Sequence, residues 1–211
     1  MKLFTRILLI ALALVGGGAI IGGAWLVAGG VSARPEPGRM ETALARRVRS
    51  LAGPRSARER KNAVELTAQS LRSGMAHFAD HCAGCHANEG SGDTEMGRGL
   101  YPRSPDMRKD ATQALSDGEL FYIIENGVRL TGMPAWGTGT PEGEQASWHL
   151  VQFVRHLPKL TDREIAEMSA MNPKSADERR DEEEARRFLE GGTGATTTPS
   201  PPRHKHPGDI R

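Results

Sequence analysis

Cys82-Ala83-Gly84-Cys85-His86 decides the fold predicted for this sequence, because it has the pattern C-x-x-C-H and contains both cysteines of the 211-residue chain. The spacing suits covalent attachment of a haem, in which the two thiols bond to the vinyl groups. The adjacent histidine then ligates the iron from one face. We therefore predict one covalent haem c bound through Cys82 and Cys85, with His86 as an axial ligand.

The residues around this motif predict helices separated by loops. Apolar residues before Cys82 follow a mostly helical spacing and deliver the helix end into the motif. Ser116 and Glu119 have the S-x-x-E form of a capping box, and Asn126-Gly127 suits a helix end. Because no convincing run alternates with period two, we predict an all-α domain over 62–160. The predicted helices span 63–81, 119–125 and 144–157, and the predicted loops span 90–105 and 131–143.

Residues from about 70 to 160 resemble the class I, mono-haem cytochromes c. Four stretches carry the resemblance in the family's order: Gly74-x-x-x-Phe78, the C-x-x-C-H motif, Gly132-Met133-Pro134-Ala135-Trp136-Gly137, and the closing helix over 148–157. The resemblance implies a small helical domain around the haem, in which the last helix crosses the first at Gly74. It also implies that Met133 is the second axial ligand and that the protein transfers electrons rather than acting as an enzyme.

Other side chains in the domain stay open as the sixth ligand. A methionine is usually a core filler, and Met75 on the first predicted helix looks structural. Two further methionines follow the haem motif closely in sequence, and the ordinary role of each histidine is surface or packing. The alternatives to Met133 are Met75, Met96, Met107, His77, His81, His149 and His156.

Further haem contacts are predicted around the two axial ligands. The Nδ1–H of His86 needs an acceptor, which in the family is a proline carbonyl that Pro102 or Pro105 could supply. Arg129 and Trp136 flank Met133 and are predicted to reach a haem propionate, the first by charge and the second through its indole N–H. The alternative for Arg129 is a solvated surface charge.

Residues 1–33 are predicted to anchor the chain in a membrane. Lys2 and Arg6 precede a charge-free, largely apolar run over 7–33. About 20 apolar residues cross a hydrocarbon core of about 30 Å. The alternative is a cleaved signal peptide, for which Val31-Ser32-Ala33 offers small residues, but a signal core has only about 7–15 residues. We therefore expect an uncleaved, single-pass anchor.

Two patterns give opposite orientations for this anchor. Counting positive charges near the helix places the C-terminal side in the cytoplasm, whereas covalent haem attachment in bacteria belongs to the periplasmic side. We follow the haem motif and predict a bacterial inner-membrane protein with its haem domain in the periplasm. The arginines that conflict with this choice are Arg34, Arg39, Arg46, Arg47 and Arg49.

Residues 34–61 are expected to form an Arg/Pro-rich linker. They carry nine Lys and Arg against three acids, a net charge of +6, whereas residues 62–160 carry eight against twelve, a net charge of −4. The preferred interpretation is a solvated tether, and the alternative is that its arginines also bind anionic lipid head groups. Nucleic acid is not an expected partner, because no aromatic pattern accompanies the basic charge.

Residues 161–211 are predicted to be a charged, Pro/Thr-rich tail that is largely disordered and contributes nothing to the core. Within it, residues 181–187 are predicted to form an exposed charged helix with ion pairs such as Glu182–Arg186 and Glu183–Arg187. His204 and His206 are candidate copper or zinc ligands, although two histidines in such a tail are more often solvated.

Three functions fit these observations. The preferred one is a membrane-anchored carrier of single electrons between membrane or periplasmic redox proteins. The alternatives are a fixed haem subunit of one oxidoreductase complex, and a haem-based sensor in which Met133 is displaceable. A thiol or zinc site at C-x-x-C is disfavoured, because a zinc site needs a second ligand pair.

Overall fold

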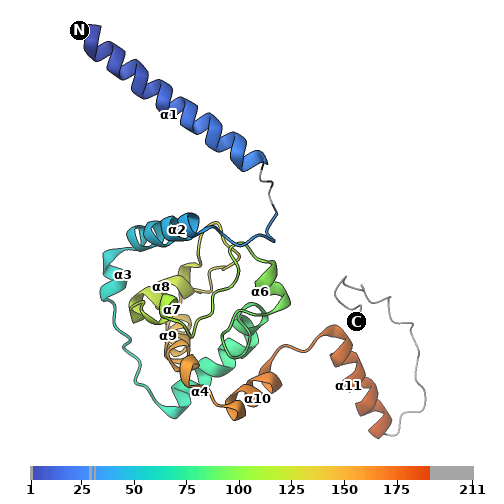
Figure 1. Cartoon of the computed structure of the whole chain (residues 1–211). Coiled ribbons are helices and arrows are strands. Elements are labelled where there is room, and N and C mark those ends of the chain that lie inside the picture. Colours follow the sequence, from blue (N-terminus) through green and yellow to red (C-terminus); the bar gives the residue numbers. More distant parts are fainter. Residues whose placement is uncertain (1, 29, 31, 191–211) are drawn as a thin grey trace. The chain divides into compact units, whose positions relative to one another are not determined.

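The computed structural model describes residues 2–28, 30 and 32–190 (Figure 1). These residues form helices and no strand, which confirms the predicted all-α fold. They divide into two compact units between Asn172 and Pro173. The predicted tail histidines, His204 and His206, lie outside the described residues. The helices are α1 (Lys2–Ala28), α2 (Arg39–Ala52), α3 (Arg55–Glu59), α4 (Ala68–His77), a π-helix (Phe78–Cys82), α5 (Ala83–His86), α6 (Glu95–Gly99), α7 (Asp110–Gln113), α8 (Asp117–Asn126), α9 (Pro141–His156), a 3-10 helix (Leu157–Lys159), α10 (Asp162–Met171) and α11 (Ala176–Leu189).

The first helix of the domain begins later than predicted. It starts after Thr67, whose side chain caps the first turn of α4. The preceding residues are non-helical because their polar groups bond to α9. The Asn62 side chain donates to the Trp148 carbonyl at 3.1 Å, and the Gln152 side chain donates to the Val64 carbonyl at 2.9 Å. Tertiary contacts thus override the local helical spacing.

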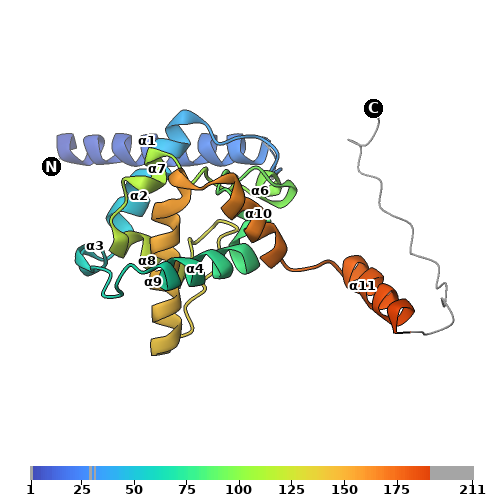
Figure 2. The same cartoon turned by 90° about the horizontal axis from the view of Figure 1, so that it is seen from below.

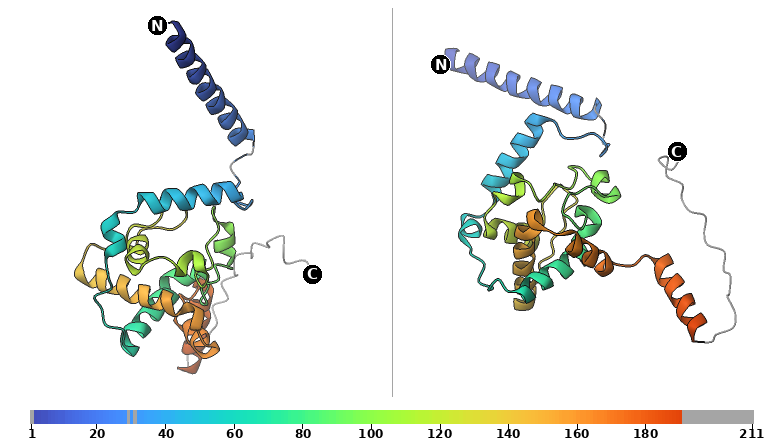
Figure 3. Two further views of the ribbon diagram at one scale, coloured as in Figure 1. Left: turned by 60° about the vertical axis from the view of Figure 1, so that its left-hand side comes forward. Right: turned by 60° about the horizontal axis from the view of Figure 1, so that its bottom comes forward.

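The crossing of α4 and α9 forms the centre of the core, as Figures 2 and 3 show. Gly74 allows the two helices to touch. A Cβ at this position would collide with the His149 carbonyl and lie 3.0 Å from the Phe153 Cβ. One turn further on, the buried rings of Phe78 and Phe153 pack with their centroids 5.1 Å apart. The close crossing that the family resemblance implied at Gly74 is therefore present.

Side-chain caps start α8 and α9. The predicted capping box is present, with hydrogen bonds of 2.8 and 3.1 Å between Ser116 and Glu119. α9 begins directly after Thr140, which caps it, and so starts earlier than predicted. The two helices pack through the stacked rings of Phe121 and Trp148, whose centroids are 4.2 Å apart.

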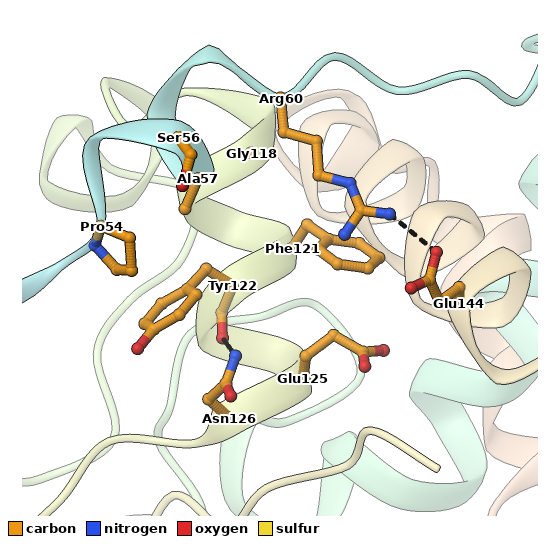
Figure 4. A pocket seen from close by; sticks show the side chains of 10 residues that line it. All are labelled: Pro54, Ser56, Ala57, Arg60, Gly118, Phe121, Tyr122, Glu125, Asn126 and Glu144. Atoms are coloured by element: carbon orange, nitrogen blue, oxygen red, sulfur yellow. Dashed lines mark hydrogen bonds and ion pairs between the residues drawn. The ribbon is translucent and has the colours of Figure 1, made fainter. Parts of the chain in front are cut away.

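The end of the expected linker packs on the domain instead of forming a tether. A Cβ on Gly118 of α8 would collide with the carbonyls of Ala57 and Arg60, so the α3 segment lies directly against α8. The Arg60 guanidinium lies 4.3 Å above the Phe121 ring and pairs with Glu144 at 2.7 Å (Figure 4). A cation–π contact and an ion pair therefore attach this segment to α8 and α9.

A hollow of about 350 Å³ opens between the α3 segment, α8 and the start of α9 (Figure 4). None of the residues predicted to bind haem lines it, so it is a separate feature of the surface. Its lining residues are Pro54, Ser56, Ala57, Arg60, Gly118, Phe121, Tyr122, Glu125, Asn126 and Glu144.

The middle of the expected linker is also ordered, because α2 occupies 39–52. Its composition of alanine, leucine and arginine favours a helix, and no proline interrupts it. Acidic residues of this region bond to the 90–105 loop. The Tyr101 hydroxyl donates to Glu41 at 2.5 Å, and Arg103 pairs with Glu36 at 3.0 Å.

The structure also differs from the expected tail over 162–171. There α10 packs on the domain, and its Met168 is 0% exposed within the core. His156 of α9 hydrogen-bonds to Glu164 at 2.8 Å, and Arg72 of α4 pairs with Glu167. The apolar content of this segment is low, but its few apolar residues share one helical face, which is sufficient for docking.

The two ends of the described chain match their predicted character. Within α1, Leu3–Ala24 is long and apolar enough to cross a membrane, and a signal sequence can share this length and composition. α11 has no buried residue and contains the predicted Glu183–Arg187 pair at 2.5 Å. The predicted Glu182–Arg186 pair was wrong, because Glu182 instead pairs with Lys174 at 2.5 Å.

We predict that Gly74→Ala destabilises the domain. The new Cβ must push α4 away from the α9 backbone, so the free energy of unfolding should fall by about 1–3 kcal/mol. Denaturant titration followed by circular dichroism at 222 nm measures the change. Gly99→Ala is the control, because a Cβ there meets nothing within 4 Å. Equal stability of the two variants would contradict the tight crossing.

A second prediction concerns α10. Met168→Ala should lower the free energy of unfolding by about 2–5 kcal/mol, because it leaves a cavity beneath a docked helix. Phe188→Ala removes a larger side chain that is 80% exposed on α11, so it should change stability by less than about 0.5 kcal/mol. If both variants unfold at the same denaturant concentration, 162–171 is a tail as the sequence predicted.

Candidate haem site

A π-helical turn delivers the C-x-x-C-H motif from the core. α4 continues into the π-helix Phe78–Cys82, and the Ala83 N–H closes the wide turn on the Phe78 carbonyl. Phe78 and Ala79 are buried, whereas Cys82 and Cys85 are half-buried free thiols. Such π turns often occur at functional sites. The motif thus continues directly from the helix crossing, and both cysteine residues are only partly buried.

His86 has a buried nitrogen without a hydrogen bond. Its Nδ1 finds no partner of normal geometry among the described residues. Burial lowers the pKa of His86, while the Pro105 carbonyl lies close enough to act in the opposite direction and raise it. Pro105, rather than Pro102, is therefore the proline whose carbonyl faces the imidazole. A neutral imidazole has one nitrogen without a proton, and that nitrogen can bind a metal.

The loop after the motif wraps around the motif's backbone. The Gly92 N–H donates to the His86 carbonyl at 2.8 Å, and the Thr94 hydroxyl donates to the Gly84 carbonyl at 2.8 Å. A Cβ on Gly97 would collide with the Cys85 carbonyl. These contacts hold the backbone of the motif over 84–86 from outside the helix.

The Cys82 thiol is poorly suited to thiolate chemistry. Burial, and secondarily the neighbouring Cys85, raise its pKa to about 12. Reactive redox thiols depend on the thiolate, whose pKa is lowered. Within residues 2–28, 30 and 32–190, no three His, Cys, Asp or Glu side chains are grouped to hold a metal ion. The raised pKa disfavours a reactive thiol at C-x-x-C, and the lack of such a group among these residues disfavours a zinc site.

A closed loop holds Met133. The Val128 N–H donates to the Met133 carbonyl at 3.1 Å, and the Met133 N–H donates to the Thr131 hydroxyl at 3.1 Å. The Thr131 hydroxyl in turn donates to the Val128 carbonyl at 2.7 Å. Gly127, at φ +66°, is needed here because a Cβ would lie 2.7 Å from the Met133 carbonyl. The Met133 side chain is half-buried at the end of this loop.

Two contacts bring the methionine loop toward the haem motif. A Cβ on Gly132 would lie 2.9 Å from Leu100 Cδ1, so the loop after the motif touches the methionine loop. The Trp136 ring lies 5.2 Å from the ring of His81, the residue before Cys82. The backbone of Trp136 is anchored to α8, because its backbone N–H donates to the Ile124 carbonyl at 3.0 Å.

Arg129 does not share the ordered surroundings of Trp136. It is exposed in the turn over 128–131 and forms no ion pair among the residues that the structure describes. Its predicted propionate contact therefore has no supporting geometry, whereas the half-buried Trp136 lies beside the motif. Of the two predicted propionate contacts, the one from Trp136 is therefore better supported than the one from Arg129.

Several of the alternative ligands are buried in the core, bonded to other residues or exposed to solvent. Met75 is 5% exposed in the core, and His156 is bonded to Glu164 at 2.8 Å. Met96 is 60% exposed on α6, and His81 pairs with Asp80 at 2.8 Å. The residues present thus fit a haem held by two thiols and His86, and Met133 stays the predicted second ligand.

Sequence reasoning missed the residues that support this site. Thr94, Gly97, Gly127 and Thr131 contact the backbone of the predicted ligands rather than a ligand side chain. The role of Thr131 is the one that follows a local pattern, because a threonine hydroxyl in a turn often accepts a hydrogen bond from the N–H two residues later.

Residues 69–154 match the family model described as cytochrome c oxidase, cbb3-type, subunit III. The matched region runs from α4 to the last turn of α9 and includes all the residues predicted to bind haem. The search of curated proteins gives no match.

A prediction follows from the Thr131 hydrogen bonds. Thr131→Val keeps the side-chain shape but removes the acceptor of the Met133 N–H, so the loop should release the methionine more readily. One hydrogen bond is worth about 1 kcal/mol, which corresponds to about fivefold tighter binding of imidazole by the ferric protein. Spectroscopic titration measures this affinity.

The matched control for Thr131→Val is Thr138→Val. The Thr138 hydroxyl bonds to Thr140 at 3.0 Å rather than to Met133, so its removal should leave imidazole binding unchanged. Identical affinities in the wild type and Thr131→Val would show that this hydrogen bond holds no iron ligand.

Proposed function

We propose that this chain, whose residues 69–154 form a mono-haem c-type cytochrome domain, carries single electrons at a membrane surface. In this proposal Cys82 and Cys85 hold one covalent haem c, and His86 and Met133 are its axial ligands. The observation that supports it most is the closed 128–133 loop around Met133, because the adjoining Trp136 ring lies 5.2 Å from the ring of His81, next to the motif.

The ligand set determines which chemistry is available. A haem with both axial positions filled exchanges electrons and leaves no open site for a substrate, so we do not expect an enzyme. A thioether ligand raises the reduction potential relative to a second imidazole. The protein's part is to keep Met133 and His86 in place, and the hydrogen bonds of Thr131 and the contacts of Gly97 support that role.

The remaining parts of the proposal concern location and partners. The apolar helix over Leu3–Ala24 supports a single-pass anchor in a bacterial inner membrane, with the domain on the periplasmic side. Residues 62–160 carry eight Lys and Arg against twelve Asp and Glu, so redox partners with a basic surface would be favoured. Trp136 and Arg129 are proposed to face the haem propionates.

A fixed subunit of one oxidoreductase complex is the second candidate. The matched family is described as a subunit of a cytochrome c oxidase, which favours this reading. Helices also occupy most of 39–59, so the connection from α1 to the domain is shorter than a tether over 34–61 would be. Size-exclusion chromatography of native membranes in mild detergent distinguishes the two, since a carrier elutes alone and a subunit elutes with oxidase activity.

The ligand assignment is tested with carbon monoxide on the full chain. Ferrous wild-type protein should not bind carbon monoxide, whereas Met133→Ala should bind it, because the variant leaves one axial position open. Difference spectra measure binding. In both proteins the haem should stay with the polypeptide during denaturing electrophoresis, and Cys82→Ala or Cys85→Ala should weaken that attachment.

Met96→Ala is the matched control, because Met96 is 60% exposed on α6 and is a rival ligand. It should behave as the wild type. Carbon monoxide binding by Met96→Ala but not by Met133→Ala would reassign the ligand. Binding by the wild type would favour the sensor with a displaceable methionine, and haem that extracts freely would refute covalent attachment.

A further inference from the structure

α2 carries an apolar stripe that nothing in the described chain covers. Met40, Leu44 and Val48 recur at every fourth residue, which places them on one face of the helix. Their exposed fractions are 85%, 65% and 55%. Three large apolar side chains in a row on an ordered helix are costly in water, so this face is expected to be covered by something outside the described residues.

The opposite face of α2 is basic. Arg39, Arg46 and Arg49 lie on it, and none of them forms an ion pair within the described part of the chain. The acid in the first turn, Glu41, is already bonded to the Tyr101 hydroxyl at 2.5 Å. These three arginines therefore present positive charge that no ion pair in the described chain neutralises.

The position of α2 in the chain indicates what covers it. α1 ends at Ala28 and α2 begins at Arg39, so α2 follows closely after the segment proposed to cross the membrane. A helix with a narrow apolar face, an arginine-rich polar face and low overall hydropathy is the pattern of helices that lie in a bilayer interface. Anionic lipid head groups are the complementary charge for its arginines.

We propose that α2 lies in the plane of the bilayer interface, with Met40, Leu44 and Val48 among the acyl chains and its arginines on anionic lipid head groups. This proposal rests on the membrane anchor of the proposed function. Gly53-Pro54 then leads into α3, which packs on α8. An interfacial α2 would therefore hold the cytochrome domain at the membrane surface in a limited set of orientations.

Spin labels on the full chain in lipid nanodiscs test this proposal. Leu44→Cys reports on the apolar face and Arg46→Cys on the basic face, while the wild type shows whether Cys82 and Cys85 take any label. In phosphatidylglycerol nanodiscs, the collision ratio of oxygen to a water-soluble nickel chelate should be about tenfold higher at 44 than at 46, because the interface excludes the chelate.

The outcomes are distinct. Equal ratios at the two positions, with the chain still eluting with the nanodisc, would overturn the interfacial helix but leave the anchor intact. Protection of position 44 from both reagents would mean that protein covers the stripe, which also overturns it. A chain that does not elute with the nanodisc overturns both the anchor and this proposal, and none of these results depends on the haem ligands.

Charge-matched variants give a second measurement without labels. Leu44→Asp places a charge in the apolar stripe, whereas Ala43→Asp places the same charge on the exposed arginine-bearing side. Hydrogen exchange of the α2 amides in phosphatidylglycerol nanodiscs should be about tenfold faster in Leu44→Asp than in the wild type, because the helix leaves the interface. Ala43→Asp should exchange as the wild type does. Equal exchange in all three chains would refute the proposal.

Discussion

The contact on which the rest of the domain depends is the approach of α4 and α9 at Gly74. No side chain fits there, so the two helix backbones touch and cannot shift without breaking the core. Phe78 and Phe153 pack immediately beside this point. Because α4 continues through a π turn into Cys82, the position of the haem motif is determined by that crossing.

The candidate site is held mainly through backbone contacts. Thr94 and Gly97 meet the carbonyls of the motif, and Thr131 and Gly127 close the loop around Met133. A ligand loop that is rigid before it meets the iron loses little conformational entropy on ligation. That arrangement suits electron transfer, in which the coordination should change little between the two oxidation states.

The connection between the proposed anchor and the domain is more structured than a tether. α3 is held on α8 and α9 by Arg60, which stacks on Phe121 and pairs with Glu144. α2 lies between this attachment and the apolar helix α1 in the chain. The orientation of the domain at a membrane would thus depend on α2 and α3, which favours partners reached at a defined height above the bilayer.

The sequence by itself determined the features that rest on local chemistry. The C-x-x-C-H motif and the apolar N-terminal run are visible in the sequence itself. Neighbouring residues also predicted the capping box of Ser116 and Glu119 and the exposed charged helix near 181–187. The order of motifs also indicated the c-type cytochrome domain that the family match over 69–154 supports. Such features depend on spacing along the chain, which a sequence shows directly.

Only the tertiary structure decided where the domain ends and what supports its site. Asn62 and Gln152 prevent a helix before Thr67 through contacts between distant residues. Met168 makes α10 part of the core, although its segment reads as a charged tail. Arg60 and Thr131 are ordinary polar residues in sequence. Their roles arise from which ring, carboxylate or carbonyl lies opposite them, because burial and hydrogen bonding depend on partners far along the chain.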